Sequence, residues 1–222
     1  MTRYPTFDVV TDTPFGGNPL AVIPDAGALP EDALQRIAAE FNYSETTFVY
    51  PHADPAHTAR IRTFTPTMEV PFAGHPTIGT AVALARLGHG PEMVLELGVG
   101  SIRAHATPSE ARFATTAGLQ TLAHPSVDEV AAALSLPPER IATATHAPVM
   151  ATLDNIPEDP ATGSAAATLA AVLARISGCD QAFTNIQGED MGRPSRIAVR
   201  TEKQAVTVAG AACRVMQGEL LI

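Results

Sequence analysis

Three side chains able to carry protons, Glu45, His75 and Asp159, stand at junctions between expected structural elements. Glu45 follows an expected helix and precedes an expected strand, in the segment Asn42-Tyr43-Ser44-Glu45-Thr46-Thr47-Phe48. A carboxylate partly withdrawn from water at such a junction has a raised pKa and can serve as a general base and acid. A single glutamate between a helix and a strand is more often an ordinary solvated residue. Glu45 therefore needs a site around it before it indicates catalysis.

Two segments repeat one pattern, a polar residue followed by Pro-x-x-Gly-(Thr/Ser)-Ala. The copies are Gly74-His75-Pro76-Thr77-Ile78-Gly79-Thr80-Ala81 and Glu158-Asp159-Pro160-Ala161-Thr162-Gly163-Ser164-Ala165. Each leads into a helix rich in small residues, and the start of a helix has free N–H groups and a partial positive charge that can bind a carboxylate. Two such starts could hold a small anion between them. Alternatively, both copies are Pro/Gly turns that cap core helices.

The repeat also pairs two polar residues, because His75 and Asp159 each stand immediately before the proline of their copy. If the two halves are related by a pseudo-two-fold axis, the imidazole and the carboxylate face a common site. Thr80 and Ser164 occupy places where the hydroxyl of a helix N-cap is expected.

These residues need a scaffold, and the chain offers short strands around single helices. The spacing of apolar and small residues predicts helices over residues 30–41, 77–87, 127–135 and 164–176. Strands are predicted at 3–10, 20–23, 46–50, 59–65, 94–97, 102–106, 112–116, 141–149, 182–186, 196–200, 205–208 and 213–216. Runs of strands around single helices indicate an α+β fold and not the strict βαβ alternation of a doubly wound sheet.

Composition limits the classes of partner. The formal net charge is −9, and Lys203 is the one lysine among 14 basic residues. Nucleic-acid binding needs a basic stripe, so we expect no nucleic-acid partner. The chain has no run of about 18 apolar residues, so no membrane span is expected. No apolar signal core follows Met1, so we expect a cytoplasmic protein. Cys179 and Cys213 lie in unrelated contexts and are expected to be reduced thiols.

Several cofactor chemistries lack their signatures in this sequence. A Schiff base to pyridoxal phosphate needs a lysine, and Lys203 lies in a charged turn. The chain has no Gly-x-x-x-x-Gly-Lys phosphate loop and no Gly-x-Gly-x-x-Gly after a strand. It has neither His-Glu-x-x-His nor Cys-x-x-Cys, so no metal site is expected. Ser164 does not lie within Gly-x-Ser-x-Gly, the motif of an esterase nucleophile. Acid/base chemistry by side chains, without a cofactor, remains.

Seven segments together resemble the PhzF-like (phenazine biosynthesis) proteins, within the diaminopimelate epimerase fold. They span nearly the whole chain. They are Phe7-Asp8-Val9-Val10, Phe15-Gly16-Gly17-Asn18-Pro19-Leu20-Ala21-Val22, Asn42-Tyr43-Ser44-Glu45-Thr46-Thr47-Phe48, Ile61-Arg62-Thr63-Phe64-Thr65-Pro66, the two copies of the repeat, and Gln187-Gly188-Glu189-Asp190-Met191-Gly192-Arg193-Pro194-Ser195.

The resemblance implies two pseudo-symmetric halves, each an antiparallel sheet wrapped around a central buried helix, with the active site between them. It implies Glu45 as the acid/base that moves a proton on a small carboxylate-bearing substrate, with His75 and Asp159 as supporting catalytic residues. Amides near Gly79 and Gly163 would be anion donors. A homodimer is also implied, and a two-thiol mechanism is not. The residues expected to bind substrate are Asn18, Gly74, Gly79, Thr80, Gly163 and Ser164.

The second half departs from the family. Dividing the chain near Gly118 gives an N-terminal half of residues 1–118 and a C-terminal half of residues 119–222, shortened before residue 155. In the first half 74 residues precede His75, whereas in the second only 41 precede Pro160. A sheet that lacks strands leaves its helix uncovered, so either another subunit covers that surface or the second half is less well ordered. The alternative to an isomerase is therefore a catalytically impaired family member that binds a small molecule or takes part in an oligomeric interaction.

Overall fold

The computed structural model describes residues 1–116, 126–133, 137–140 and 158–222. Its strands are β1 (Thr2–Val9), β2 (Asn18–Ile23), β3 (Glu45–Tyr50), β4 (Ala59–Phe64), β5 (Glu69–Val70), β6 (Glu92–Leu97), β7 (Gly100–Ala106), β8 (Glu110–Thr115), β9 (Ala182–Gln187), β10 (Ser195–Glu202) and β11 (Ala205–Leu220). Its helices are α1 (Glu31–Phe41), α2 (Gly74–Arg86), α3 (Val127–Ala133) and α4 (Gly163–Ser177), with a short 3₁₀ helix at Pro138–Arg140. None of these helices in the described ranges is long and apolar enough to cross a membrane.

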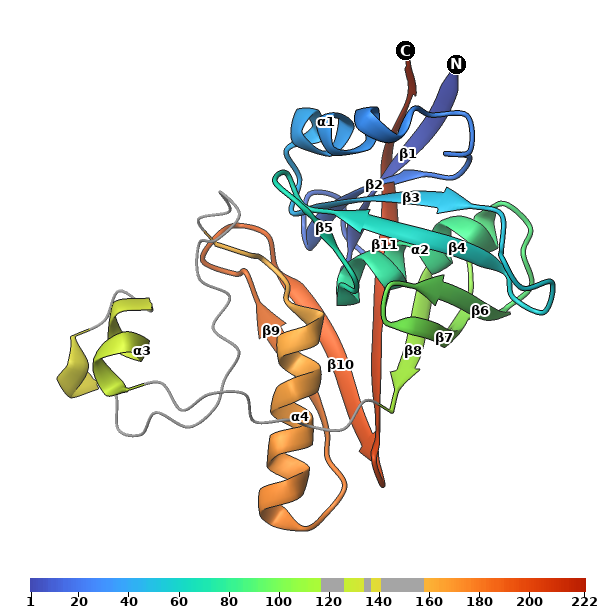
Figure 1. Ribbon diagram of the computed structural model, residues 1–222. Helices are drawn as coiled ribbons and strands as arrows, with labels where there is room; N and C mark the ends of the chain where they lie inside the picture. The colour runs from blue at the N-terminus through green and yellow to red at the C-terminus, as the bar shows by residue number, and fades with distance from the viewer. Residues whose placement is uncertain (117–125, 134–136, 141–157) are drawn as a thin grey trace.

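The strands form a mixed sheet that closes into a barrel (Figure 1). The order around the barrel is β1-β2-β3-β4-β6-β7-β8-β11, and β11 pairs with β1 to complete it. Strands β10 and β9 extend from β11 as an open branch, and β5 pairs with the edge of β4. The pairs β2–β3 and β4–β6 are parallel, so the expectation of purely antiparallel sheets is wrong. Each parallel pair is joined through a helix, because a parallel connection needs a crossover.

Helix α2 is buried from Gly74 to Leu84, and it contacts β1, β2, β3, β7, β8 and β11. Apart from His75, Thr77 and Thr80, the buried residues of this stretch are apolar or glycine on all sides, which is typical of a helix segment with no solvent-facing surface. Gly79 allows the closest approach to the sheet, because a Cβ there would lie 2.6 Å from Cδ2 of Leu20 and 2.7 Å from Cγ2 of Val9. The barrel thus fixes α2, and with it the position of His75.

Helix α4 packs on β10 and β11 and is less enclosed than α2. Its buried residues are Gly163, Ala166 and Ala170, whereas Leu169 and Ile176 are 43% and 75% exposed. The three strands β9, β10 and β11 provide the sheet beside it (Figure 1). The helix that follows the second copy of the repeat is therefore packed against the sheet on one side.

Strand β11 joins the two parts of the sheet. Residues 206–211 pair with β8, residues 205–209 pair with β10, and the pairing with β1 covers residues 212–220. The sequence predicted two strands here, at 205–208 and 213–216. The strand instead continues through Gly210. Glycine allows β11 to pass close to Val10 here, because a Cβ at that position would lie 2.6 Å from Cγ1 of Val10.

Most predicted elements are present, with ends that differ by one to three residues. Helix α2 begins at Gly74, so the whole first copy of the repeat lies within it, whereas α4 begins at Gly163, so residues 158–162 of the second copy precede their helix. The expected equivalence of His75 and Asp159 is therefore wrong, because His75 lies in a helical turn and Asp159 does not. The predicted strand at 141–149, the boundary near Gly118 and the shortening before residue 155 lie outside the described residues and remain predictions.

Candidate active site

The starts of two strands and two helices meet at one place in the fold. Strands β2 and β3 are parallel neighbours with Leu20 opposite Glu45, so both strands begin at the same end of the sheet. Asn18 is the first residue of β2, and Glu45 is the first residue of β3. His75 lies in the first turn of α2, and Asp159 lies four residues before α4. Four segments distant in the sequence thus bring polar side chains together.

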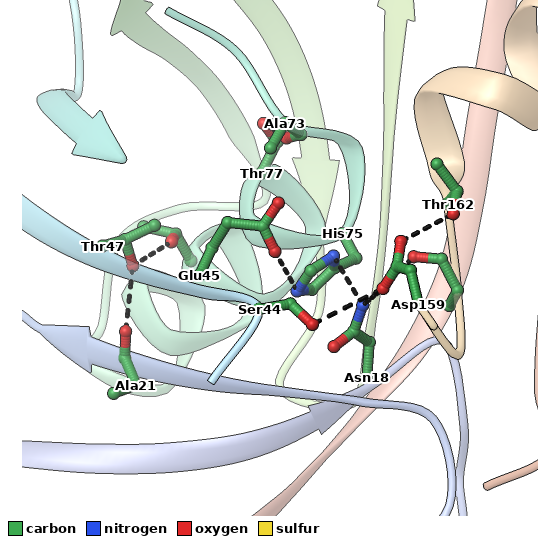
Figure 2. A network of polar contacts seen from close by, with 12 residues as sticks. Asn18, Ala21, Ser44, Glu45, Thr47, Ala73, His75, Thr77, Asp159 and Thr162 are labelled. Atoms are coloured by element: carbon green, nitrogen blue, oxygen red, sulfur yellow. Dashed lines mark hydrogen bonds and ion pairs between the residues drawn. The ribbon is translucent and has the colours of Figure 1, made fainter. Parts of the chain in front are cut away.

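These side chains form a continuous chain of polar contacts (Figure 2). Nε2 of His75 lies 3.3 Å from Oε2 of Glu45, and Nδ1 of His75 lies 3.3 Å from Nδ2 of Asn18. Nδ2 of Asn18 donates to Oδ1 of Asp159 at 2.5 Å and to the carbonyl oxygen of Ala161 at 3.2 Å. The two oxygen acceptors fix the orientation of the Asn18 amide. The three residues proposed for acid/base chemistry are therefore linked through Asn18.

Two hydroxyl groups also contact the carboxylate of Asp159. Oγ1 of Thr162 donates to Oδ2 of Asp159 at 2.6 Å, and Oγ of Ser44 lies 3.5 Å from Oδ1. Burial raises the pKa of Asp159, and hydrogen bonds to the carboxylate, from Thr162 first, oppose that increase. The carboxylate is thus accommodated in a largely buried place by donors from both parts of the chain.

His75 is neutral in this structure. Burial lowers the pKa of its imidazole to about 3, although a hydrogen bond with the backbone of Pro19 acts in the opposite direction. Its contact with Glu45 is therefore one between a neutral imidazole and a carboxyl group, and not an ion pair. With its hydrogen on Nε2, the ring directs that hydrogen toward Glu45 and leaves Nδ1 unprotonated against Nδ2 of Asn18.

The burial of His75 has a consequence for acid stability. Its folded-state pKa of about 3 lies below the ordinary value of 6.5, so between these pH values the unfolded chain binds a proton that the folded chain does not. The free energy of unfolding therefore falls as pH decreases through this range. We expect His75→Gln to reduce the fall between pH 7 and pH 4 by about 3 kcal/mol, measured by urea unfolding at each pH.

The control for this experiment is His89→Gln, which removes one histidine from an exposed position. It shows whether a change in the pH dependence comes from the burial of His75 or from the removal of any histidine. If the free energy of unfolding of His75→Gln fell between pH 7 and pH 4 as steeply as that of the parent protein, the low pKa assigned to His75 would be contradicted.

The two helix starts touch each other. A Cβ built on Gly74 would lie 3.0 Å from Cα of Gly163 and 3.1 Å from the amide nitrogen of Ser164. A Cβ on Gly163 would in turn lie 3.3 Å from Cα of Gly74. The first intrahelical bonds are donated by Thr77 and by Ala166. The amides before them have no acceptor within their helices, so the ends of two helices that carry such amides lie against each other next to His75.

Three of the residues expected to bind substrate lie at positions that differ from the sequence prediction. Gly79 lies in the second turn of α2 and packs on β1 and β2, so its amide is not at the helix start. Thr80 is not an N-cap: its Oγ1 lies 2.9 Å from Oγ1 of Thr47 inside the barrel. Ser164 is the second residue of α4, whose N-cap is Thr162. Asn18, Gly74 and Gly163 do lie at the junction.

Sequence reasoning missed three residues around Asp159, namely Ser44, Thr162 and Gln187. Thr162 stands three residues after Asp159 in a Pro-containing turn, a spacing at which a hydroxyl can bond an aspartate. Gln187 opens the motif that ends the resemblance to the family, but its partner on the other segment could not be inferred. Its Nε2 donates to the backbone oxygen of Asp159 at 2.7 Å.

The chain matches the family model described as phenazine biosynthesis-like protein (PhzC-PhzF) over residues 7–147 and 131–218. It is 33% identical to an uncharacterized isomerase of Mesorhizobium japonicum over 99% of both chains. It is 32% identical to a trans-2,3-dihydro-3-hydroxyanthranilate isomerase of Pseudomonas aeruginosa over 91% of both. The solved structure of a predicted epimerase from Pseudomonas aeruginosa has a TM-score of 0.85 and 27% identity over the full length of both chains.

The protein therefore belongs to the PhzF family, and its relatives place it among the isomerases of that family. The fold is the epimerase-like fold of these proteins. The aligned region with the Mesorhizobium relative is 299 residues long, which exceeds the 222 residues of this chain. That relative therefore has residues without a counterpart here.

Proposed function

We propose that this chain is a cofactor-independent isomerase that moves a proton on a small carboxylate-bearing substrate, with Glu45 as the general acid and base. The observation that carries the proposal is the contact between Glu45 and His75, continued through Asn18 to Asp159. This arrangement supplies a proton acceptor, a partner for it and a second carboxyl group from the other half of the chain.

The mechanism begins with removal of a proton from a substrate carbon by the ionised Glu45. The protonated carboxyl group then returns the proton to another carbon, or to the opposite face of the same one. Neutral His75, with its hydrogen on Nε2, would direct that hydrogen toward Glu45 without adding a positive charge beside it. A charged imidazolium would favour the ionised carboxylate alone and would weaken it as a base. The low pKa of His75 therefore suits a residue that must work in both directions.

The touching helix starts support a role in binding the carboxylate of the substrate. The first turns of α2 and α4, whose earliest amides have no acceptor within the helix, lie against each other next to His75. An anion there interacts favourably with both helix dipoles, and developing negative charge on the substrate would be stabilised in the same way. We assign Gly74, Gly163 and Ser164 to this contact. The repeat in the sequence, and not the position of the two helix starts within it, is the basis for proposing two pseudo-symmetric halves.

The relative from Pseudomonas aeruginosa suggests the first substrate to test. Its name gives trans-2,3-dihydro-3-hydroxyanthranilate, a cyclic carboxylic acid with acidic C–H bonds. We propose a substrate of this class for the present chain, and a cytoplasmic homodimer as its working form.

A second candidate function is favoured by the open side of α4. Its exposed apolar residues Leu169, Leu173 and Ile176 suit a member that has lost turnover and acts through binding or oligomeric interaction. A shortened second half could lose turnover by displacing Asp159, whereas Asp159 contacts Asn18 at 2.5 Å. We therefore prefer the isomerase.

Deuterium labelling separates the two candidates. The protein would be incubated in deuterated water with trans-2,3-dihydro-3-hydroxyanthranilate and, separately, with simple amino and hydroxy acids, and the products analysed by proton NMR. We expect protein-dependent deuterium at a carbon of the dihydro acid. Saturable binding of that compound without any label in it would contradict the isomerase and support the second candidate.

A further inference from the structure

The motif from Gln187 to Ser195, called here the connecting loop, has no part in the proposed proton transfer. It runs from the end of β9 to the start of β10. It contacts the segment that carries Asp159 at one end and the segment that carries Asn18 at the other. Its two polar side chains with such contacts are Gln187 and Arg193, and each reaches a different side of the site.

Gln187 determines the position of the turn that contains Asp159. Its Nε2 donates to the backbone oxygen of Asp159 at 2.7 Å and to Oγ1 of Thr162 at 3.3 Å, while its Oε1 accepts the backbone N–H of Thr162 at 3.2 Å. Because Oγ1 of Thr162 accepts from Gln187, its own hydrogen is directed to the carboxylate of Asp159, at 2.6 Å. Gln187 therefore acts on the carboxylate through Thr162.

Arg193 holds the turn that precedes Asn18. Its Nε donates to the carbonyl oxygen of Gly17 at 2.8 Å, and its NH2 group donates to that of Gly16 at 2.9 Å. The same NH2 group bonds Oδ1 of Asp8 at 2.6 Å, and Oδ2 of Asp8 accepts the amide of Phe15 at 2.6 Å. A guanidinium can serve three acceptors in a fixed geometry, which an ammonium cannot.

The connecting loop is itself closely fixed between these two ends. Gly188 has φ of +75°, and a Cβ there would lie 2.5 Å from the carbonyl oxygen of Arg193 and 2.8 Å from that of Pro160. The amide of Arg193 donates to the carbonyl oxygen of Gly188 at 2.9 Å. A short, closed loop of this kind transmits position because its ends cannot move independently.

We propose that the connecting loop sets the contact between Asn18 and Asp159, with Gln187 and Arg193 as positioning residues. Both act through other groups: Gln187 through Thr162, and Arg193 through the turn at Gly16 and Gly17. The effect on turnover rests on the proposed function, because it presumes that Asp159 takes part in the reaction. The effect on the geometry of the site does not.

The test uses Gln187→Ala and Arg193→Lys, with Gln217→Ala and Arg196→Lys as controls at exposed positions. Carbon-13 NMR of labelled aspartate, assigned with Asp159→Asn, would follow the titration of Asp159. Nitrogen-15 NMR would follow the side-chain amide of Asn18. Thermal unfolding would establish that each variant is folded. Arg193→Lys keeps a cation opposite Asp8, so folding is less at risk than with a neutral residue.

We expect Gln187→Ala to move the titration midpoint of Asp159 to higher pH, because the hydrogen bond from Thr162 loses its fixed direction. We expect Arg193→Lys to shift the amide resonance of Asn18. In both variants kcat for the dihydro acid should fall about 10-fold or more while KM changes less than about threefold. The controls should leave all three quantities unchanged.

Folded variants with an unchanged Asp159 titration and an unchanged Asn18 amide would overturn the proposal. Absence of turnover in the parent protein would instead count against the proposed function, and the two NMR measurements would still decide the role of the loop.

Discussion

Replacing Glu45 by glutamine is expected to lower the turnover of trans-2,3-dihydro-3-hydroxyanthranilate by about 10³-fold or more. Glutamine has nearly the same shape and can still contact Nε2 of His75, but it can neither take a proton from carbon nor return one. The loss should therefore appear in kcat, with KM almost unchanged, because the amide preserves the space around the substrate. Steady-state rates from proton NMR would measure both constants.

The matched control is Glu40→Gln, which removes an exposed carboxylate from α1. It should retain the rate of the parent protein. The thermal midpoint of Glu45→Gln should be at least as high as that of the parent, since a neutral side chain replaces an ionisable one at a position only 9% exposed. A folded Glu45→Gln variant within tenfold of the parent rate would show that another group moves the proton.

Substitution of Gly74 by alanine is expected to reduce kcat by about 10²-fold, because the two helix starts must separate. The new Cβ would meet backbone atoms of Gly163 and Ser164 at 3.0–3.1 Å, which no change of rotamer relieves. Separation moves His75 relative to Asp159 and widens the place proposed for the substrate carboxylate. KM should therefore rise as well, in contrast to Glu45→Gln.

Gly90→Ala is the matched control, because a Cβ at Gly90 meets no atom within 4 Å. It should leave both kcat and KM unchanged. If Gly74→Ala had a higher thermal unfolding midpoint and full activity, alanine would fit at the contact between the two helices. The close approach of the starts of α2 and α4 would then have no role in catalysis. Helix propensity alone favours such a gain by up to about 1 kcal/mol, so loss of activity would have to come from geometry.

The sequence predicted the polar centre of the site better than the architecture around it. His75 and Asp159 were identified from the repeat and Glu45 from the resemblance to the family, and these features do not depend on knowing the sheet. The start of α2 was placed three residues too late, because the helix was expected to begin after Pro76. Proline lacks an N–H and is tolerated in the first turn, where that group has no helical partner.

Strand pairing could not be predicted in the same way. The segments β2-α1-β3 and β4-α2-β6 are parallel pairs joined through helices, although the whole chain lacks regular βαβ alternation. The continuity of β11 through Gly210 depends on pairing with β1, β8 and β10, which lie far away in the sequence. Tertiary contacts of this kind override local propensity. The bond from Gln187 to the turn at Asp159 was missed for the same reason.

Proton exchange, measured apart from net turnover, tests the central claim most directly. The parent protein, Glu45→Gln and Glu40→Gln would each be incubated in deuterated water with trans-2,3-dihydro-3-hydroxyanthranilate, and the rate of deuterium entry at carbon followed by proton NMR. Because exchange requires removal of the proton and not completion of the reaction, it reports on the proton-transfer step itself. We predict rapid labelling by the parent and by Glu40→Gln, and none above background by Glu45→Gln. Labelling by folded Glu45→Gln at the rate of the parent would contradict the account.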